Sequence, residues 1–508
     1  MNLFKKNLSF ILSAAGITFL YFLTRIYNIL SLPIFTDEAI YTRWSQIAKY
    51  DSAWRFISLT DGKQPLLIWL NIVSFDFFKD PLLAGRMVSV FSGFLVMAGL
   101  FAVSYLLFRN KTISLLSSFL YVIFPFALIY DKMAIYESLL AVFFIWGLFF
   151  EILLVKKMRM DIAMVLGFIL GGGVLTKSSG FLSIYLMPFL FILLDVTKKT
   201  WRRKYIKLIL LLLVSIVIAN GMYGVLRLSP FFHIIAEKNL VFVQTPVEWL
   251  KLQNADKIST FLNNFTRLGG WFVNYFSIPF IATVILAFIF KRNYKEKIIL
   301  LLWFVLPFFA LVVAGKVIYP RFIFFMTIPL LPLVAYGFYM SARAIKNKIA
   351  ILFLSIALVS YPLFASYYVL FDIARAPIPE LDLEQLINGW PAGGGVRKSI
   401  VFFEKEAEKK PIMIVTQGTF GLMPFAYEIY LIENKNIEIK GYWPTKDNIP
   451  DEVLKISEKK DTYFVFYQPC TLCEYPGAAP KAWPLEKVSE FKKGIGETTL
   501  SVYKVVKR

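Results

Sequence analysis

The side chains that could do chemistry in this sequence are carboxylates and cations spread between residues 37 and 321. They are Asp37, Glu38, Lys63, Arg86, Glu137, Lys177 and Arg321. A carboxylate can accept the proton of an attacking hydroxyl, and fixed cations can stabilise a phosphate as it leaves. A surface that gathered these side chains would therefore have the groups needed to move a substituent from a phosphate to an acceptor.

Histidine and cysteine add little to this set, because the chain has one histidine, His233, and two cysteines. A histidine-rich metal site and a Cys/His nucleophile pair are therefore excluded, and no metal ligands can be named. Acid and base chemistry must fall to carboxylates, lysine or tyrosine.

The elements that must position these side chains are membrane spans. Hydrophobic residues make up 58% of the 508 residues, whereas soluble domains contain about 45–50%. The formal net charge is +21, but Lys and Arg cluster in short segments between apolar runs, as membrane topology requires. Nucleic-acid binding is therefore the weaker interpretation of the charge, and we expect no nucleic-acid partner.

About eleven runs are long and apolar enough to cross a bilayer, which takes about 20 residues. They cover residues 8–27, 83–108, 112–130, 137–155, 161–176, 179–195, 205–227, 271–290, 297–315, 322–342 and 348–371. The first run lacks a clear cleavage site and ten more follow it, so we interpret it as an anchor.

The charged loops predict the orientation of these spans. Counted from the N-terminus, alternate loops hold Lys5 and Lys6; Arg109 and Lys111; Lys156, Lys157 and Arg159; Lys198, Lys199, Arg202, Arg203 and Lys204; Lys291, Arg292, Lys295 and Lys297; and Arg343, Lys346 and Lys348. The positive-inside bias makes these loops cytoplasmic. The opposite side then has two long loops, 28–82 and 228–270, and everything after residue 371. The candidate acids and cations at span ends fall on this outer side.

The composition changes after residue 371, where Pro, Gly and charged residues interrupt short apolar runs such as 411–415 and 462–466. We therefore predict a polytopic α-helical membrane domain, 1–371, with a small extracytoplasmic α/β domain, 372–508. Cys470 and Cys473 lie in this tail. A local disulfide or two unpaired thiols is favoured over zinc or a redox centre.

Several candidate residues also have simpler interpretations. Lone cations such as Lys132 and Lys316 usually anchor a span end by snorkelling. Asp37 and Glu38 could cap a surface helix, with Thr36 or Asp37 at the N-cap. The stretch 171–178 resembles a phosphate-binding loop, but Thr176 replaces its required glycine. We interpret its three glycines as sites of close helix packing.

Residues 35–41 read Phe-Thr-Asp-Glu-Ala-Ile-Tyr, and residues 63–66 read Lys-Gln-Pro-Leu. In this order they resemble the D-E-A-x-Y and K-P-P-L of the GT-C glycosyltransferases of the protein O-mannosyltransferase and aminoarabinose transferase type. Residues 81–86 resemble P-x-x-x-x-R, residues 132–137 resemble R-x-x-x-x-D, and Lys177 and Arg321 resemble later family cations. The sequence departs from the family pattern at Gln64, Lys132, Glu137 and Phe322. The resemblance covers residues 8–340.

The resemblance implies transfer of a sugar, with inversion, from a polyprenyl-phosphate donor to the hydroxyl of a lipid, glycan or protein acceptor at the outer face of the membrane. It makes Asp37 the general base and Glu38 a neighbour that positions it. Glu137 would orient the acceptor or hold a divalent cation if the reaction uses one. The resemblance assigns the lipid phosphate to Lys63, Arg86, Lys177 and Arg321.

Two other functions remain open at this point. A transporter or lipid flippase could use the same scaffold, but it should show midspan charges in repeated halves, which this sequence does not display. A catalytically inactive relative could act as a scaffold, although the intact Asp37 weighs against it.

Overall fold

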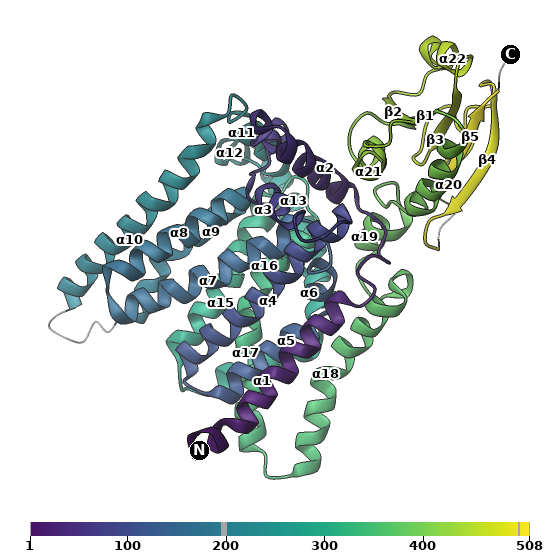
Figure 1. Ribbon diagram of the computed structural model, residues 1–508. Coiled ribbons are helices and arrows are strands. Elements are labelled where there is room, and N and C mark those ends of the chain that lie inside the picture. Colours follow the sequence, from purple (N-terminus) through teal and green to yellow (C-terminus); the bar gives the residue numbers. More distant parts are fainter. Residues whose placement is uncertain (1, 195–200, 496–497, 507–508) are drawn as a thin grey trace. The chain divides into compact units, whose positions relative to one another are not determined.

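The computed structural model describes residues 2–194, 201–495 and 498–506 (Figure 1). The chain forms two compact units, each built from three stretches of sequence. The first, here the helical unit, consists of Met1–Tyr27, Arg55–Leu67 and Met87–Phe371. The second, here the α/β unit, consists of Asn28–Trp54, Ile68–Arg86 and Asp372–Arg508.

The helical unit is a bundle of long apolar helices joined by short helical turns (Figure 1). Its long helices are α1 (Asn2–Ile26), α4 (Pro81–Phe108), α7 (Tyr136–Lys157), α8 (Met160–Thr176), α10 (Trp201–Gly224), α13 (Asn254–Phe276), α15 (Tyr294–Ala314), α17 (Leu331–Ala344) and α18 (Lys348–Phe371). The shorter ones include η2 (Ile57–Asp61), α5 (Lys111–Val122), α6 (Pro125–Tyr130), α9 (Phe181–Leu186), α11 (Ile234–Phe242), α12 (Pro246–Lys251), α14 (Ile278–Ile289) and η6 (Pro320–Ile323).

Among the described residues, seven helices are long and apolar enough to cross a membrane. The bent pair α13 and α14 would make an eighth. The other expected spans correspond to shorter apolar segments, such as α5 and α8. Lys198 and Lys199, which the sequence places in a charged loop, lie outside the described residues.

The structure differs from the expected span at 271–290. Helix α13 begins at Asn254, inside the predicted loop, and α14 leaves it at an angle of 91°. Ser277, at the break, has a φ of 68°, and Pro279 follows it. Because a proline has no amide hydrogen and its ring clashes with the preceding turn, an unbroken helix through this point is disfavoured. The hydropathy pattern alone could not show this bend.

The glycines of α8 lie where neighbouring helices approach closely. A Cβ atom at Gly171 would stand 2.2 Å from the sulfur of Met222, and one at Gly172 would stand 2.2 Å from the ring of Phe143. Neither position has room for a larger residue. This confirms that the glycines serve helix packing.

The α/β unit contains a five-stranded sheet with helices on both faces (Figure 1). The strands, in the order β2-β1-β3-β5-β4, are β2 (Ile437–Tyr442), β1 (Ile412–Gln417), β3 (Asp461–Phe466), β5 (Thr499–Val505) and β4 (Leu485–Lys492). β1 pairs in parallel with β2 and β3, and β5 pairs antiparallel with β3 and β4. Its main helices are α2 (Thr36–Tyr50), α20 (Val396–Lys409), α21 (Leu422–Leu431) and α22 (Asp451–Ser457).

The strands alternate their side chains between two apolar layers. Ile412 and Ile414 pack with α20 and α21 on one face, whereas Met413 and Val415 pack with Val453 of α22 on the other. The connection from β1 to β2 therefore lies on one face of the sheet, and the connection from β2 to β3 lies on the other.

Residues of the first long loop share the core on the α21 face. Ile34, Ala39 and Leu82 are buried together with Val396 and Leu422 of the tail. The compact unit that holds the tail therefore also includes residues 28–54 and 68–86, whereas the sequence placed the boundary at residue 371. Because the tail meets segments that lie hundreds of residues earlier in the chain, no local pattern could reveal this partnership.

The two cysteines of the tail form a disulfide, Cys470–Cys473, in the loop that follows β3. Their spacing left open a local disulfide or two unpaired thiols, and the structure has the disulfide. Local disulfides of this kind persist in oxidising compartments.

Candidate active site

The acidic pair stands in the first turn of α2, in the α/β unit. The N-cap residue is Phe35, and not Thr36 or Asp37 as the capping interpretation proposed. The carboxylate that closes this helix end belongs to Glu38, whose Oε2 accepts a hydrogen bond from the amide of Phe35 at 3.0 Å. The helix is no surface element, because nine of its 15 residues are buried. Asp37 itself is partly exposed, whereas Glu38 is buried.

Glu38 is paired with Arg86 in the first turns of α4. Arg86 Nε donates to Glu38 Oε1 at 2.8 Å and a terminal nitrogen donates to Oε2 at 2.8 Å, and both side chains have no exposed surface. The remaining donors of Arg86 bind the carbonyls of Ile29, Leu32 and Pro33. Such a bidentate, charge-assisted pair fixes both partners. Arg86 therefore holds Glu38 and the chain before α2. All its donors are engaged there, so the structure favours this positioning role over the phosphate role predicted from the sequence.

The tail holds the start of α2 in place. Thr36 donates from its amide and its hydroxyl to the carbonyl of Pro391, at 3.0 and 2.9 Å. Phe35 forms an antiparallel bridge with Ala392. Two turns further on, Arg43 Nε lies 2.6 Å from Glu428 Oε2 of α21. The segment that carries Asp37 is thus fixed at both its backbone and its side chains by residues of the tail.

Three of the other predicted residues meet in the helical unit. Lys177 Nζ lies 2.9 Å from Glu137 Oε1, and Arg321 Nε lies 3.9 Å from the same oxygen. Glu137 begins α7, Lys177 follows the last residue of α8, and Arg321 lies in η6. Two cations therefore converge on one carboxylate. A pair of cations held at one point suits an anionic ligand.

Lys63 is connected to this cluster through aromatic side chains. Its ammonium lies 5.3 Å from the ring centre of Phe242, and that ring lies 6.0 Å from the ring of Phe322. Lys177 stands over the other end of this pair, 4.8 Å from the ring centre of Phe322. Sequence reasoning missed Phe242, because it lies in the loop 228–270, which has no family resemblance.

Hydrogen bonds tie the Lys63 segment to the segments that carry Glu137 and Lys177. Gln64 Nε2 donates to Ser178 Oγ at 2.7 Å, and Tyr136 donates to the carbonyl of Gln64 at 2.9 Å. The four residues that form the cationic cluster, Lys63, Glu137, Lys177 and Arg321, therefore come from segments that are bonded to one another. We keep the name cationic cluster for these four.

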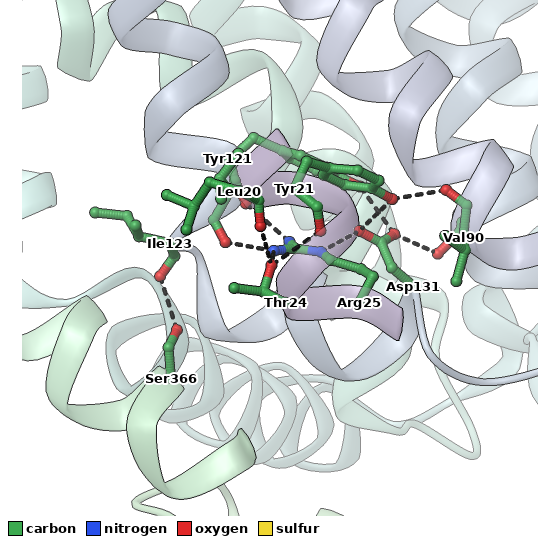
Figure 2. Close-up of polar contacts among 11 residues, drawn as sticks. Leu20, Tyr21, Thr24, Arg25, Val90, Tyr121, Ile123, Asp131 and Ser366 are labelled. Carbon is green, nitrogen blue, oxygen red and sulfur yellow. Dashed lines mark hydrogen bonds and ion pairs between the residues drawn. The ribbon is translucent and has the colours of Figure 1, made fainter. Parts of the chain in front are cut away.

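A second buried charge pair stands beside Glu137. Figure 2 shows Arg25 of α1 together with Asp131, two residues with no exposed surface and an Nε–Oδ2 distance of 3.4 Å. Tyr121 and Ser138 also donate to Asp131 Oδ1, at 2.9 and 2.8 Å. Tyr21 completes the group, with its hydroxyl 3.3 Å from Asp131 Oδ2 (Figure 2). Because Ser138 directly follows Glu137, this network fixes the start of α7.

The two lysines interpreted as snorkelling anchors have specific partners. Lys132 is buried and donates to the carbonyl of Tyr27 at 2.8 Å. Lys316 donates to the carbonyl of Leu240 and to Glu248. Both lysines hold a neighbouring chain segment, which a free anchor in the lipid headgroups would not do.

Sequence reasoning also missed a carboxyl within a span. Glu151 of α7 is buried, and within the described part of the chain neither carboxyl oxygen has a hydrogen-bond partner. A transporter would need such groups in repeated halves, and Glu151 is a single residue. Across the described residues, no three His, Cys, Asp or Glu side chains are grouped closely enough to hold a metal ion.

Part of the sequence matches a known protein family. Residues 62–223 match the family model for dolichyl-phosphate-mannose-protein mannosyltransferase, a stretch that includes Lys63, Arg86, Glu137 and Lys177. No curated protein matches the sequence.

Solved structures share the fold at low sequence identity. ArnT from Cupriavidus metallidurans bound to undecaprenyl phosphate is 13% identical, with a TM-score of 0.56 over 98% of each chain. The same protein in its apo state is also 13% identical, with a TM-score of 0.58 over 98% of this chain and 97% of that chain. The archaeal oligosaccharyltransferase AglB from Archaeoglobus fulgidus, in complex with an inhibitory peptide and a dolichol-phosphate, is 12% identical with a TM-score of 0.52. That match covers 91% of this chain and 70% of AglB. The predicted resemblance to GT-C membrane glycosyltransferases is confirmed.

Proposed function

Taking the chain as a membrane glycosyltransferase of the GT-C type, we propose that it moves a sugar from a polyprenyl-phosphate donor to an acceptor hydroxyl, with inversion. The observation that carries the proposal is the cationic cluster, in which Lys177 and Arg321 converge on the single carboxylate of Glu137. Two cations held together at the ends of apolar helices suit the phosphate of a lipid donor. The relative from Cupriavidus metallidurans was crystallised with undecaprenyl phosphate.

The proposed reaction is a single displacement. The acceptor oxygen attacks the anomeric carbon, the bond from that carbon to the phosphate oxygen breaks, and polyprenyl phosphate leaves with the bonding electrons. Lys63, Lys177 and Arg321 stabilise the phosphate charge that develops. The acceptor's proton passes to the carboxylate of Asp37, the general base. Because one displacement occurs at the anomeric carbon, its configuration inverts.

Glu38 and Glu137 support these groups in different ways. Glu38 closes the N-terminus of α2 and is itself fixed by Arg86, so the turn that carries Asp37 is rigid. Glu137 orients Lys177 and Arg321, and it is the residue that would hold a divalent cation or orient the acceptor if the reaction required either. The acceptor is a lipid, a glycan or a protein.

The proposal places the N-terminus in the cytoplasm and the α/β unit outside the cell membrane. It rests on the lysines and arginines that alternate loops carry, and the Cys470–Cys473 disulfide agrees with an oxidising compartment. Single cysteines at Asn110 and Asn347 should be shielded from an impermeant thiol reagent in intact cells, whereas one at Asn254 should react. Labelling at the first two positions would reverse the orientation.

The decisive test uses the purified full chain and synthetic donors. Undecaprenyl- and dolichyl-phosphate carrying a hexose or a pentose are incubated with the protein, and release of the polyprenyl phosphate is followed by mass spectrometry. We expect release with at least one donor and its loss in Asp37→Asn. A folded wild-type protein that releases nothing from any of these donors would contradict the proposal and favour the transporter alternative.

A further inference from the structure

Two exposed aromatic side chains lie at the carboxyl edge of the parallel strands in the α/β unit. Phe420 stands in the loop 418–421 after β1 and is 51% exposed, and Trp443 directly follows β2 and is 53% exposed. The two loops meet where the amide of Gly418 donates to the carbonyl of Tyr442 at 2.8 Å. Large exposed apolar rings on two loops that meet at the end of a sheet favour a ligand with an apolar face.

The same edge contains the point where the chain reverses its direction across the sheet. The connection from β1 to β2 runs through α21 on one face, and that from β2 to β3 runs through α22 on the other. In open α/β sheets, ligands bind outside the carboxyl ends of the strands at such a reversal, here between β1 and β3.

A buried amide at this point has an unused donor. Gln417, the last residue of β1, accepts hydrogen bonds through its Oε1 from the amides of Tyr467 and Gln468, at 3.1 and 3.2 Å. Its Nε2 is buried and has no hydrogen-bond partner among the described residues. An unpaired buried donor is costly, so a water or a ligand group at this edge is the expected partner of Gln417 Nε2.

This edge lies along the helix face that carries Asp37. A Cβ atom at Gly421 would stand 3.5 Å from the methyl group of Thr36, and the ring of Phe420 lies 6.1 Å from that of Trp44. Asp37 and Trp44 are seven positions apart on α2, so they share a face and are separated by about 10 Å along its axis. The loop 418–421 therefore contacts α2 at the residue before Asp37 and, through the ring of Phe420, at Trp44.

We propose that Gln417, Phe420 and Trp443 form the binding surface for the acceptor, and that the part of the acceptor bound here is a saccharide. The C–H face of a sugar ring packs on aromatic rings, while its hydroxyls accept hydrogen bonds from amide donors such as Gln417 Nε2. A saccharide of two or three rings held on Phe420 would reach the position of Asp37. This inference rests on the proposed function, in which Asp37 takes the proton of the acceptor hydroxyl.

The test measures saccharide binding apart from donor turnover. The full chain is placed in lipid nanodiscs, so that no maltoside detergent competes, and binding is followed by saturation-transfer NMR. The probes are the methyl glycosides of glucose, mannose and N-acetylglucosamine, and the disaccharides maltose and chitobiose. We expect at least one probe to bind, and Phe420→Ala and Trp443→Ala each to weaken that binding about tenfold.

Ile432→Ala is the matched control, because Ile432 is 48% exposed and follows the end of α21 that points away from this edge. It should bind the probe as the wild type does. Three outcomes would overturn the inference: no probe binds the wild type, the two aromatic variants bind it unchanged, or Ile432→Ala weakens it equally. Release of polyprenyl phosphate by the wild type, measured separately, tests the proposed function itself, so the two failures are distinguishable.

Discussion

Among the described residues, a fully buried arginine–carboxylate pair is found in each unit, and the two pairs differ in what surrounds them. In the helical unit, Arg25 faces Asp131 within a ring of hydroxyl donors, beside the residue that follows Glu137. In the α/β unit, Arg86 forms a bidentate pair with Glu38, next to Asp37, and its other donors bind backbone carbonyls.

The comparison teaches that Asp37 and Glu137 stand beside these networks without belonging to either arginine pair. Asp37 precedes Glu38, and Glu137 precedes Ser138, which donates to Asp131. Buried pairs of this kind are weak evidence for stability, because removing two charges from water is expensive. They do fix the geometry of the chain around them. We therefore assign both arginines a positioning role, and the following predictions separate that role from the chemistry.

The largest effect is expected for Asp37→Asn. Loss of a general base typically lowers the rate by about 10²–10⁴-fold. Donor binding should stay intact, because other residues bind the phosphate of the donor. The measurement is turnover of a synthetic donor, with donor affinity determined separately. Asp51→Asn, at the other end of α2, is the matched control and should keep normal turnover. Normal turnover in Asp37→Asn would move the base to another carboxylate.

Arg25→Met and Arg86→Met should each lower stability by about 3–5 kcal/mol, because each leaves a buried carboxylate without its partner. Hydrogen exchange should then locate the loosened region. Hydrogen exchange should become faster in peptides of α7 in Arg25→Met, and in peptides of α2 and α21 in Arg86→Met. The double variant Arg86→Met/Glu38→Met should recover much of the lost stability. If both single variants loosened the same peptides, the two pairs would not act on separate units.

Arg321→Ala and Lys177→Ala should weaken binding of polyprenyl phosphate by about ten- to a hundredfold each. A hydrogen bond to a charged group contributes about 1.5–3 kcal/mol, which sets this range. Lys316→Ala serves as the control, since Lys316 binds Glu248 and the carbonyl of Leu240. Unchanged affinity in both test variants would mean that these cations only hold Glu137.

The smallest effect is expected for Lys493. Its side chain is buried, and burial lowers its pKa to about 7. Its ordinary value is 10.5, so between pH 7 and that value the folded chain holds fewer protons than the unfolded chain. The contribution of Lys493 to stability therefore rises with pH across this window. Lys493→Met should melt above the wild type at pH 6.5, and the difference should shrink toward pH 10. A constant difference would show that Lys493 does not titrate there.

Several features could be predicted from the sequence because they depend on local composition or spacing. The run of glycines in α8 indicated close packing, and apolar runs indicated the spans. The motifs around Asp37, Lys63, Glu137 and Lys177 indicated the GT-C relationship. Each of these features is carried by residues near one another in the chain.

Other features required the tertiary structure, because they join residues that are far apart in sequence. The packing of Ile34 and Leu82 with the tail, the pairing of Arg25 with Asp131, and the contact of Lys63 with Phe242 have no local signature. A cation at a span end looks the same in the sequence whether it binds lipid, a carbonyl or a carboxylate. Only the folded chain decides which of these partners is within reach, and so which charges are left for a substrate.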